Sequence, residues 1–494
     1  AAAGGRDAGA VFVRRSGEPL TRGISGMFSV AGNAKFLAQS AEAIADVEKE
    51  RWVLAQQEAA AVAGNREQIG DAVLQLYYND YIAQWDALLA DVTVAPFGNL
   101  EQGARIANML SGAASPLRLF MVAASKETTL GGAKADPMAA VSAAVKGKLD
   151  AYKKKLESAI GANADAAPAP AKAQNPVDLH FDDLHKMTAG APAPLDQVLA
   201  MLKDVALYLD AAGAAKRSGA PPPAGDALSK VKLEAQGKPA PLGALLKSID
   251  GSGAGLTSGS EHERLNALWT SGAAQFCRQA VAGRYPLVRS ASQDVTPDDF
   301  GKFFGPGGLI DDFFQKNLLQ YVDMGGAQWR WRATASNGSL GISQGVLDEF
   351  QRAARIRDAF FGNGGRQASM RFELKPGAVD GAITKLTLDI DGQVLPVAAG
   401  GAGMAFQLPS GKGGGQVRLD GTPASAHASL RSDGPWAWFR MLDKATVEPA
   451  AQGERYKITF DLDGRKAVLD LTASSVVNPF KRATLEQFRC MDKL

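Results

Sequence analysis

The stretch from Phe300 to Phe361 constrains the fold of this chain more than any other. It is crowded with aromatic side chains, although aromatic residues make up only 7% of the sequence. The hydrophobic pattern is helical before this stretch and alternates with a period of two after it. We therefore interpret it as a buried structural junction between a helical half and a β half. The side chains expected to form the junction are Phe303, Phe304, Phe313, Phe314, Trp329, Trp331, Phe360 and Phe361.

The size and charge of the chain exclude several classes of protein. A length of 494 residues suggests about three domains, at roughly 100–200 residues each. With 54 Lys and Arg against 52 Asp and Glu, the formal charge is only +2, which disfavours nucleic acid and other polyanions as partners. No segment approaches the ~20 consecutive apolar residues of a membrane span. Because the chain begins at Ala1 and its first Met is Met27, we expect a piece of a longer protein.

The first 130 residues predict a helical domain. An aromatic stripe at helical spacing runs through it, and packing against a neighbouring helix is a more economical interpretation of this stripe than a ligand shelf. Ser115 followed by Pro116 predicts the start of another helix. The stripe consists of Ile69, Val73, Tyr77, Tyr81 and Trp85, and Leu76, Leu88 and Leu89 are expected to widen it.

Three further regions follow. Residues 131–176 are rich in Ala and Pro and predict a linker or long loop. Residues 177–365 predict a second helical domain that contains the junction. Residues 366–494 predict a β-sandwich-like domain of about seven strands with a terminal helix, in which Asp391-Gly392 and Asp463-Gly464 are hairpin turns. Within it, residues 370–475 are expected to fold independently. The fold class is therefore α+β multidomain, with a long helical N-terminal half and a small antiparallel β-sandwich-like C-terminal domain.

Three motifs suggest chemistry, but each has a simpler structural explanation. Gly341-Ile342-Ser343-Gln344-Gly345 matches a hydrolase nucleophile elbow, yet the Asp and His that must follow are not in place, and Ser343 suits a helix N-cap. His180 and His185 are five residues apart, which separates them by about 140° on a helix instead of aligning them for a metal. Lys412 lies in a Gly-rich stretch without the remaining P-loop residues. We therefore predict no catalytic, metal or cofactor-binding residue.

Ordered blocks along nearly the whole chain resemble the C-terminal, periplasmic region of the IcmF-type (TssM) inner-membrane proteins of the bacterial type VI secretion system. Two departures are the Met after Cys490, where the family pattern has Pro, and the Ala/Pro-rich insert. The blocks are SGEPLTRGISGMF at 16–28, ERWVL at 50–54, YYNDYIAQWDALLADV at 77–92, LSGAASPL at 110–117, FFGPGGLIDDFF at 303–314, FQRAARIRDAFF at 350–361, GPWAWFR at 434–440, and NPF and FRC near the end.

The resemblance implies a non-enzymatic envelope-spanning scaffold. Its membrane spans and nucleotide-binding-like domain would lie upstream of Ala1, and its C-terminal β-domain would bind an outer-membrane lipoprotein, TssJ. Further implied partners are the inner-membrane protein TssL, through the parent chain, and other copies in a ring-like complex. The partner-binding residues are unknown within 366–494. The alternative function is a periplasmic hydrolase or carbohydrate-binding module acting on the cell wall.

The resemblance also bears on the two cysteines. If the chain lies in the oxidising periplasm, Cys277 and Cys490, which flank the junction from opposite sides, are candidates for a disulfide. The alternative is two free, buried thiols.

Overall fold

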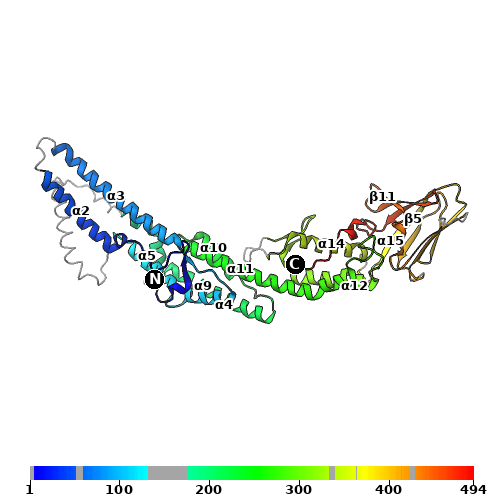
Figure 1. Ribbon diagram of the computed structural model, residues 1–494, viewed down its shortest axis with the longest axis horizontal. Helices are drawn as coiled ribbons and strands as arrows, with labels where there is room; N and C mark the ends of the chain where they lie inside the picture. The colour runs from blue at the N-terminus through cyan, green and yellow to red at the C-terminus, as the bar shows by residue number, and fades with distance from the viewer. Residues whose placement is uncertain are drawn as a thin grey trace. The chain divides into compact units, whose positions relative to one another are not determined.

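The computed structural model describes residues 5–51, 59–131, 175–332, 340–362, 364–412, 414–422 and 429–494. These residues form two compact units, the N-terminal unit up to Ser258 and the C-terminal unit from Gly259. The boundary lies within one helix, α11 (Leu242–Trp269) (Figure 1). Each unit has its own hydrophobic core.

The N-terminal unit is helical apart from one short antiparallel ladder of two strands. The Ser115 hydroxyl accepts a hydrogen bond from the Arg118 N–H, so the predicted helix start is confirmed. Its elements are α1 (Ala8–Val11), β1 (Phe12–Arg14), η2 (Gly26–Phe28), α2 (Val30–Arg51), α3 (Ala59–Asp91), β2 (Val92–Val94), α4 (Leu100–Ser111), α5 (Pro116–Glu127), α7 (Pro176–His180), α8 (Asp182–Thr188), α9 (Pro194–Ser218), α10 (Ala227–Gly237) and the first part of α11.

No single helix among the described residues is long and apolar enough to span a membrane; only the pair α4 and α5, bent by 45°, meets the criteria together.

The aromatic stripe on α3 is only partly a packing surface. Tyr77, Tyr81 and Trp85 are buried, and their polar tips donate hydrogen bonds of 2.7, 2.5 and 2.9 Å to backbone carbonyls of neighbouring segments. Val73 and Leu76 are 46% and 65% exposed. The prediction that Leu76 widens the buried stripe is therefore wrong, because periodicity gives the face of a helix but not how far its neighbours extend along it.

The helices on both sides of the Ala/Pro-rich segment share one core, and this differs from the predicted boundaries. The sequence predicts separate domains at 1–130 and 177–365, but α9 packs against α4, and residues 175–258 belong to the N-terminal unit. The Asp178 carboxylate also accepts hydrogen bonds from the N–H groups of Leu130 and Gly131, at 2.6 and 2.8 Å. A linker-like composition does not reveal whether its flanking segments pack together. Most of the predicted linker itself, 132–174, lies outside the described residues.

The helical part of the C-terminal unit begins in α11 and includes three π-helical turns, η3, η4 and η5. Asp311 and Asp312 lie in the first turn of α13, where carboxylates favour the helix N-terminus. The elements after α11 are η3 (Thr270–Ala274), η4 (Cys277–Val281), α12 (Pro297–Phe304), α13 (Leu309–Phe313), η5 (Phe314–Leu318), η6 (Leu319–Tyr321), β3 (Val322–Asp323), β4 (Arg330–Trp331) and α14 (Gln344–Phe360).

The rest of the C-terminal unit is an antiparallel sandwich of two sheets, with nine strands among the described residues where the sequence predicts about seven. The strands are β5 (Met370–Val379), β6 (Lys385–Ile390), β7 (Gln393–Pro396), β8 (Met404–Leu408), β9 (Gln416–Thr422), β10 (Ser429–Asp433), β11 (Thr446–Pro449), β12 (Arg455–Leu462) and β13 (Arg465–Ala473), joined by the short helix α15 (Ala437–Leu442) and followed by α16 (Ala483–Glu486).

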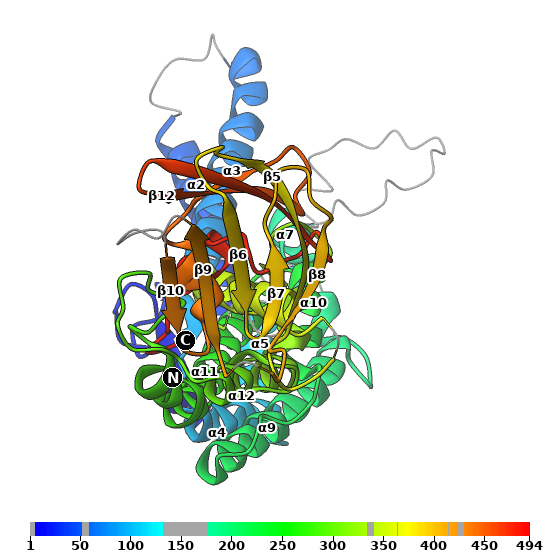
Figure 2. The ribbon, with the colours of Figure 1, turned by 90° about the vertical axis from the view of Figure 1, so that its right-hand side faces the viewer.

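The strand order is β10-β9-β6-β7 in the four-stranded sheet, which faces the viewer in Figure 2, and β11-β12-β13-β5-β8 in the other. Both predicted hairpin turns are present. Asp391 and Gly392 have φ values of 52° and 80°, and Asp463 and Gly464 have 55° and 79°. Positive φ at both central residues is the signature of a type I′ turn, whose twist matches that of the strands.

The terminal segment differs from the terminal helix that the sequence predicts, for which Asn478 is the expected cap and Cys490 the expected end. Only the four residues of α16 are helical. Asn478 is buried instead, where its carbonyl accepts a hydrogen bond from the Tyr456 hydroxyl at 3.0 Å and its amide donates to the Gly453 carbonyl at 3.1 Å. Asn is as suited to bracing a loop as to capping a helix, so the residue type alone did not decide between the two.

Candidate functional site

The aromatic junction is a continuous network of ring contacts around Phe300. The Phe300 ring centroid lies 4.9 Å from that of Phe304, 5.1 Å from that of Phe360 and 4.9 Å from that of Trp436. Such tilted and edge-to-face pairs add to the free energy gained by burying the rings. Of the predicted junction residues, Phe303, Phe304, Phe313, Phe314, Phe360 and Phe361 are buried, and Trp329 and Trp331 pack against the same core from partly exposed positions.

The junction extends into the sandwich through Trp436 and α15. The Trp436 ring contacts Phe360, and its Nε1 donates a hydrogen bond of 2.7 Å to the Val295 carbonyl of the helical part. On the other side, Trp438 stacks on Phe372 of β5 at 5.4 Å. Helical part and sandwich therefore share one core. The shared core crosses the predicted domain boundary at residue 366, because α15 buries rings against both parts.

A polar network that the sequence analysis missed borders this core. The Tyr285 hydroxyl donates to the Asp443 carboxylate at 2.7 Å, and the Arg440 guanidinium lies over the Tyr285 ring at 4.0 Å. Arg482 and Arg289 pair with the same carboxylate at 3.3 and 2.9 Å. Burial, and then the hydrogen bond to Asp443, raise the pKa of Tyr285, so this hydroxyl stays protonated. The sequence does contain a signal for this network, because the charged residues Arg440 and Asp443 lie within the apolar segment 435–443.

The Gly-rich turn before α13 is fixed by an ion pair. The Asp311 carboxylate accepts a hydrogen bond from the Gly307 N–H at 2.9 Å and pairs with Arg357 of α14. Beside this pair, a hollow lined by Phe314, Trp329 and other residues has a volume of only about 10 Å³, room for about one water molecule. Its size suits neither a substrate nor a cofactor.

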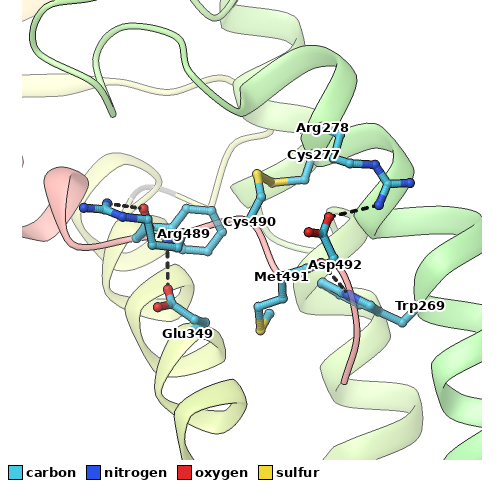
Figure 3. The surroundings of a disulfide bond; sticks show 9 residues. Trp269, Cys277, Arg278, Glu349, Arg489, Cys490, Met491 and Asp492 are labelled. Atoms are coloured by element: carbon cyan, nitrogen blue, oxygen red, sulfur yellow. Dashed lines mark hydrogen bonds and ion pairs between the residues drawn. A yellow bond between two sulfur atoms is a disulfide. The ribbon is translucent and has the colours of Figure 1, made fainter.

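The two cysteines close the junction covalently in the structure. Cys277 at the start of η4 is bonded to Cys490, with a Cα–Cα distance of 5.9 Å across 213 positions of sequence (Figure 3). Both predicted disulfide positions are thus brought together. The bridge joins the helical part to the end of the chain and encloses the sandwich between them.

The segment around Cys490 is also held by hydrogen bonds and an ion pair (Figure 3). Trp269 Nε1 donates to the Met491 carbonyl at 2.9 Å, and Arg278 pairs with Asp492 at 3.1 Å. On the opposite side, the Arg489 N–H donates to Glu349 of α14 at 2.9 Å. The disulfide is therefore one of several contacts that fix this segment.

Two of the three motifs that suggested chemistry, Ser343 and the histidine pair, have structural roles. Ser343 Oγ accepts a hydrogen bond from the Val346 N–H at 3.3 Å, so the predicted N-cap is confirmed. His180 pairs with Asp86 at 2.9 Å, whereas His185 lies 2.9 Å from the Thr128 hydroxyl. No cluster of three or more His, Cys, Asp or Glu suited to a metal occurs in the described part of the chain.

Three family models match this chain in sequence order. Residues 1–129 match the IcmF-related family (intracellular multiplication and human macrophage-killing), residues 261–366 match the type VI secretion protein IcmF helical domain, and residues 372–475 match the type VI secretion protein IcmF C2-like domain. The second and third ranges correspond to the helical part and the sandwich of the C-terminal unit.

The chain is 39% identical over 511 residues to the type VI secretion system component TssM1 of Pseudomonas aeruginosa. The alignment covers 100% of this chain but 46% of that protein, so the chain spans about half the length of this curated relative. A type VI secretion system membrane core complex has a chain with a TM-score of 0.62 at 19% identity, covering 99% of this chain and 93% of that one. A chain of a type VI membrane complex has a TM-score of 0.59 at 17% sequence identity, and the match covers 86% of each chain. These two structures show that the fold is shared.

Proposed function

Because the chain belongs to the IcmF-related family of type VI secretion proteins, we propose that it is the periplasmic part of an envelope-spanning scaffold in the membrane complex. In this proposal it has no enzymatic activity and transmits position and load between the two membranes. Its C-terminal sandwich binds an outer-membrane lipoprotein, TssJ. The parent chain binds TssL at the inner membrane and associates with further copies in a ring-like complex.

The observation that carries the proposal is the covalent closure of the C-terminal unit. A bridge between Cys277 and Cys490 suits an oxidising compartment such as the periplasm, since cytosolic thiols are kept reduced. It limits how far pulling on the chain end can separate the helical part from the sandwich. This property suits a connector that carries load between the two membranes.

A cell-wall hydrolase is the alternative. It would need paired carboxylates or a metal in a cleft. The sequence has three Asp-Asp pairs. Asp311 of the Asp311-Asp312 pair is engaged by Arg357, and Asp182 of the Asp182-Asp183 pair is engaged by Lys186. The Asp298-Asp299 pair lies in the first turn of α12, where carboxylates favour the helix N-terminus. These roles favour the scaffold.

Two assays on the purified chain test the proposal. We expect the chain to capture the lipoprotein encoded with its secretion system, and to leave cell-wall sacculi intact. Release of wall fragments that disappears in Asp311→Asn or Ser343→Ala would overturn the scaffold function. Absence of lipoprotein binding in non-reducing buffer would overturn the linking role.

A further inference from the structure

The four edge strands of the sandwich, β7, β8, β10 and β11, differ in how well they could accept another strand. In an antiparallel ladder the backbone N–H and C=O groups of alternate residues face the neighbouring strand, and those of the residues between them face away. One observed hydrogen bond therefore shows, for every residue of that strand, whether its backbone groups face the neighbouring strand or face outward. At an edge, the outward groups form a template for strand addition unless something blocks them.

The β7 edge is blocked by a proline. The Val397 N–H donates to the Leu386 carbonyl at 2.8 Å, so odd-numbered residues of β7 face β6. Val394 and Pro396 face outward. Because Pro396 has no N–H, only Val394 can donate to an added strand.

The β11 edge is blocked in the same way. The Ala450 N–H donates to the Arg455 carbonyl at 2.9 Å, so Thr446 and Glu448 face β12. Val447 and Pro449 face outward, and Pro449 again lacks a donor. Pro396 and Pro449 both stand at outward-facing positions, so the missing N–H removes no hydrogen bond to the neighbouring strand.

The β8 edge is occupied by a side chain. The Ser474 N–H donates to the Arg371 carbonyl at 3.2 Å, so Arg371 of β5 faces β13, and its partner Gln407 on β8 faces outward. The Gln393 side chain takes both backbone groups of Gln407: its Nε2 donates to the carbonyl at 3.0 Å and its Oε1 accepts from the N–H at 3.4 Å. A side-chain amide thus replaces an incoming strand.

The β10 edge has the lightest protection. The Asp391 N–H donates to the Gln416 carbonyl at 2.8 Å, so Gln416 faces β6, and alternation turns Ser429, Arg431 and Asp433 of β10 outward. Lys444, which follows α15, covers the Arg431 carbonyl. In the described part of the chain, the N–H groups of these three residues donate no hydrogen bond.

We propose that the sandwich binds its protein partner by adding an extended segment of that partner to β10. This inference deepens the proposed function and rests on it for the identity of the partner. β10 is the edge on which consecutive outward residues keep their N–H donors, because none is proline and no side-chain amide occupies them. Lys444 is a displaceable cover: its flexible, exposed side chain can release the Arg431 carbonyl to an incoming N–H donor.

The exposed face of β10 defines the kind of segment that fits. Arg431 and Asp433 project to solvent and pair with each other at 3.0 Å, so an added strand with one acidic and one basic side chain can take up both charges. Leu430 and Ser432 lie on the other face, and Ser432 is 6% exposed with no hydrogen-bond partner for its hydroxyl among the described residues. A residue of the added strand would lie beside each.

The test compares variants that remove one outward backbone N–H group with variants that keep it. Arg431→Pro removes one outward N–H without removing a ladder bond, and it obstructs an added strand. We expect it to weaken binding of the purified chain to the lipoprotein by roughly tenfold or more. Arg431→Ala keeps the N–H and should bind within about twofold of wild type, as should Val394→Pro on β7, the matched proline at an outward position. Circular dichroism confirms that each variant is folded.

Lys444→Ala uncovers the Arg431 carbonyl and should leave affinity unchanged or tighten it about threefold. Wild-type-like affinity of a folded Arg431→Pro variant overturns the assignment of β10, and equal losses in Arg431→Pro and Val394→Pro do so too. If the wild-type chain fails to bind the lipoprotein, the linking role fails. A photo-cross-linker at position 431 of the full-length protein in secreting cells then decides: an adduct with another component of the membrane complex supports the edge, and no adduct overturns it.

Discussion

The two units of this chain achieve stability in different ways. In the N-terminal unit the core is built by helix packing and contains no cysteine. In the C-terminal unit, helices between residues 265 and 361 share a core with the strands of the sandwich. Cys277 is joined to Cys490 by a disulfide, and Trp269 donates a hydrogen bond to the Met491 carbonyl. The comparison teaches that the two units differ less in their content of helix or strand than in how their ends are joined: the C-terminal unit links distant segments of the chain by a covalent bond, and the N-terminal unit relies on packing.

The largest expected difference concerns the disulfide. A Cys277→Ala, Cys490→Ala double variant should lower the free energy of unfolding of the C-terminal unit by up to about 5 kcal/mol, because a closed loop of some 200 residues restricts the unfolded chain strongly. The N-terminal unit should be unaffected. Urea unfolding followed by hydrogen exchange resolves the two units, and an equal loss in both would contradict the comparison.

A smaller effect is expected from the centre of the junction. Phe300→Ala should cost about 3–5 kcal/mol, because a fully buried ring is lost from contacts with both the helical part and Trp436. The exposed Leu207→Ala in the N-terminal unit is the control and should change stability by less than about 0.5 kcal/mol. If Phe300→Ala destabilises the helices and leaves the strands intact, the shared core is wrong.

Replacing a glycine should change stability in opposite directions in the two units. Gly464→Val should destabilise the sandwich by about 1–2 kcal/mol, since φ of 79° strains a β-branched residue. Gly255→Ala in α11 should stabilise that helix by up to about 1 kcal/mol, because an added Cβ would meet no atom within 4 Å beyond the adjoining backbone of its own helix. Melting temperatures of the two variants should move in opposite directions, and a shared direction would show that one assignment fails.

The smallest effect is a pH dependence of the N-terminal unit. Hydrogen bonds from the Ser16 hydroxyl and N–H, and then Arg14, lower the pKa of Asp91 from 3.8 to about 2. A depressed pKa in the folded state stabilises the fold above pH 4, and this contribution is lost as the pH falls from 4 to 2. Asp91→Asn should be less stable than wild type at pH 6, with the difference vanishing near pH 2. A constant difference across this range would exclude Asp91 as the cause.

Local features of this fold were predictable from the sequence, and long-range ones were less so. The Asp-Gly turns and the caps at Ser115 and Ser343 follow from residue chemistry over a few positions. The disulfide was predicted because the chain has only two cysteines and because of the family resemblance. The predicted boundaries around the Ala/Pro-rich segment were wrong because α9 packs against α4 across it. The contact of α15 with the junction was also not predicted, since periodicity does not encode which apolar faces meet.

The edges of the sandwich illustrate the same limit. Pro396 and Pro449 are visible in the sequence, but their outward positions appear only once the register is known. The amide of Gln393 over the backbone of Gln407 joins edge strands of different sheets, and no local pattern predicts that contact.

The most direct test of the central claim is native-state hydrogen exchange of the whole chain over a series of denaturant concentrations. If the C-terminal unit is one cooperative body, the core amides of α12, α14, β5 and β13 converge on a single free energy of opening, and reduction of the disulfide lowers it for all four together. Strands that open at a lower free energy than α12 and α14, with the disulfide intact, would contradict the account.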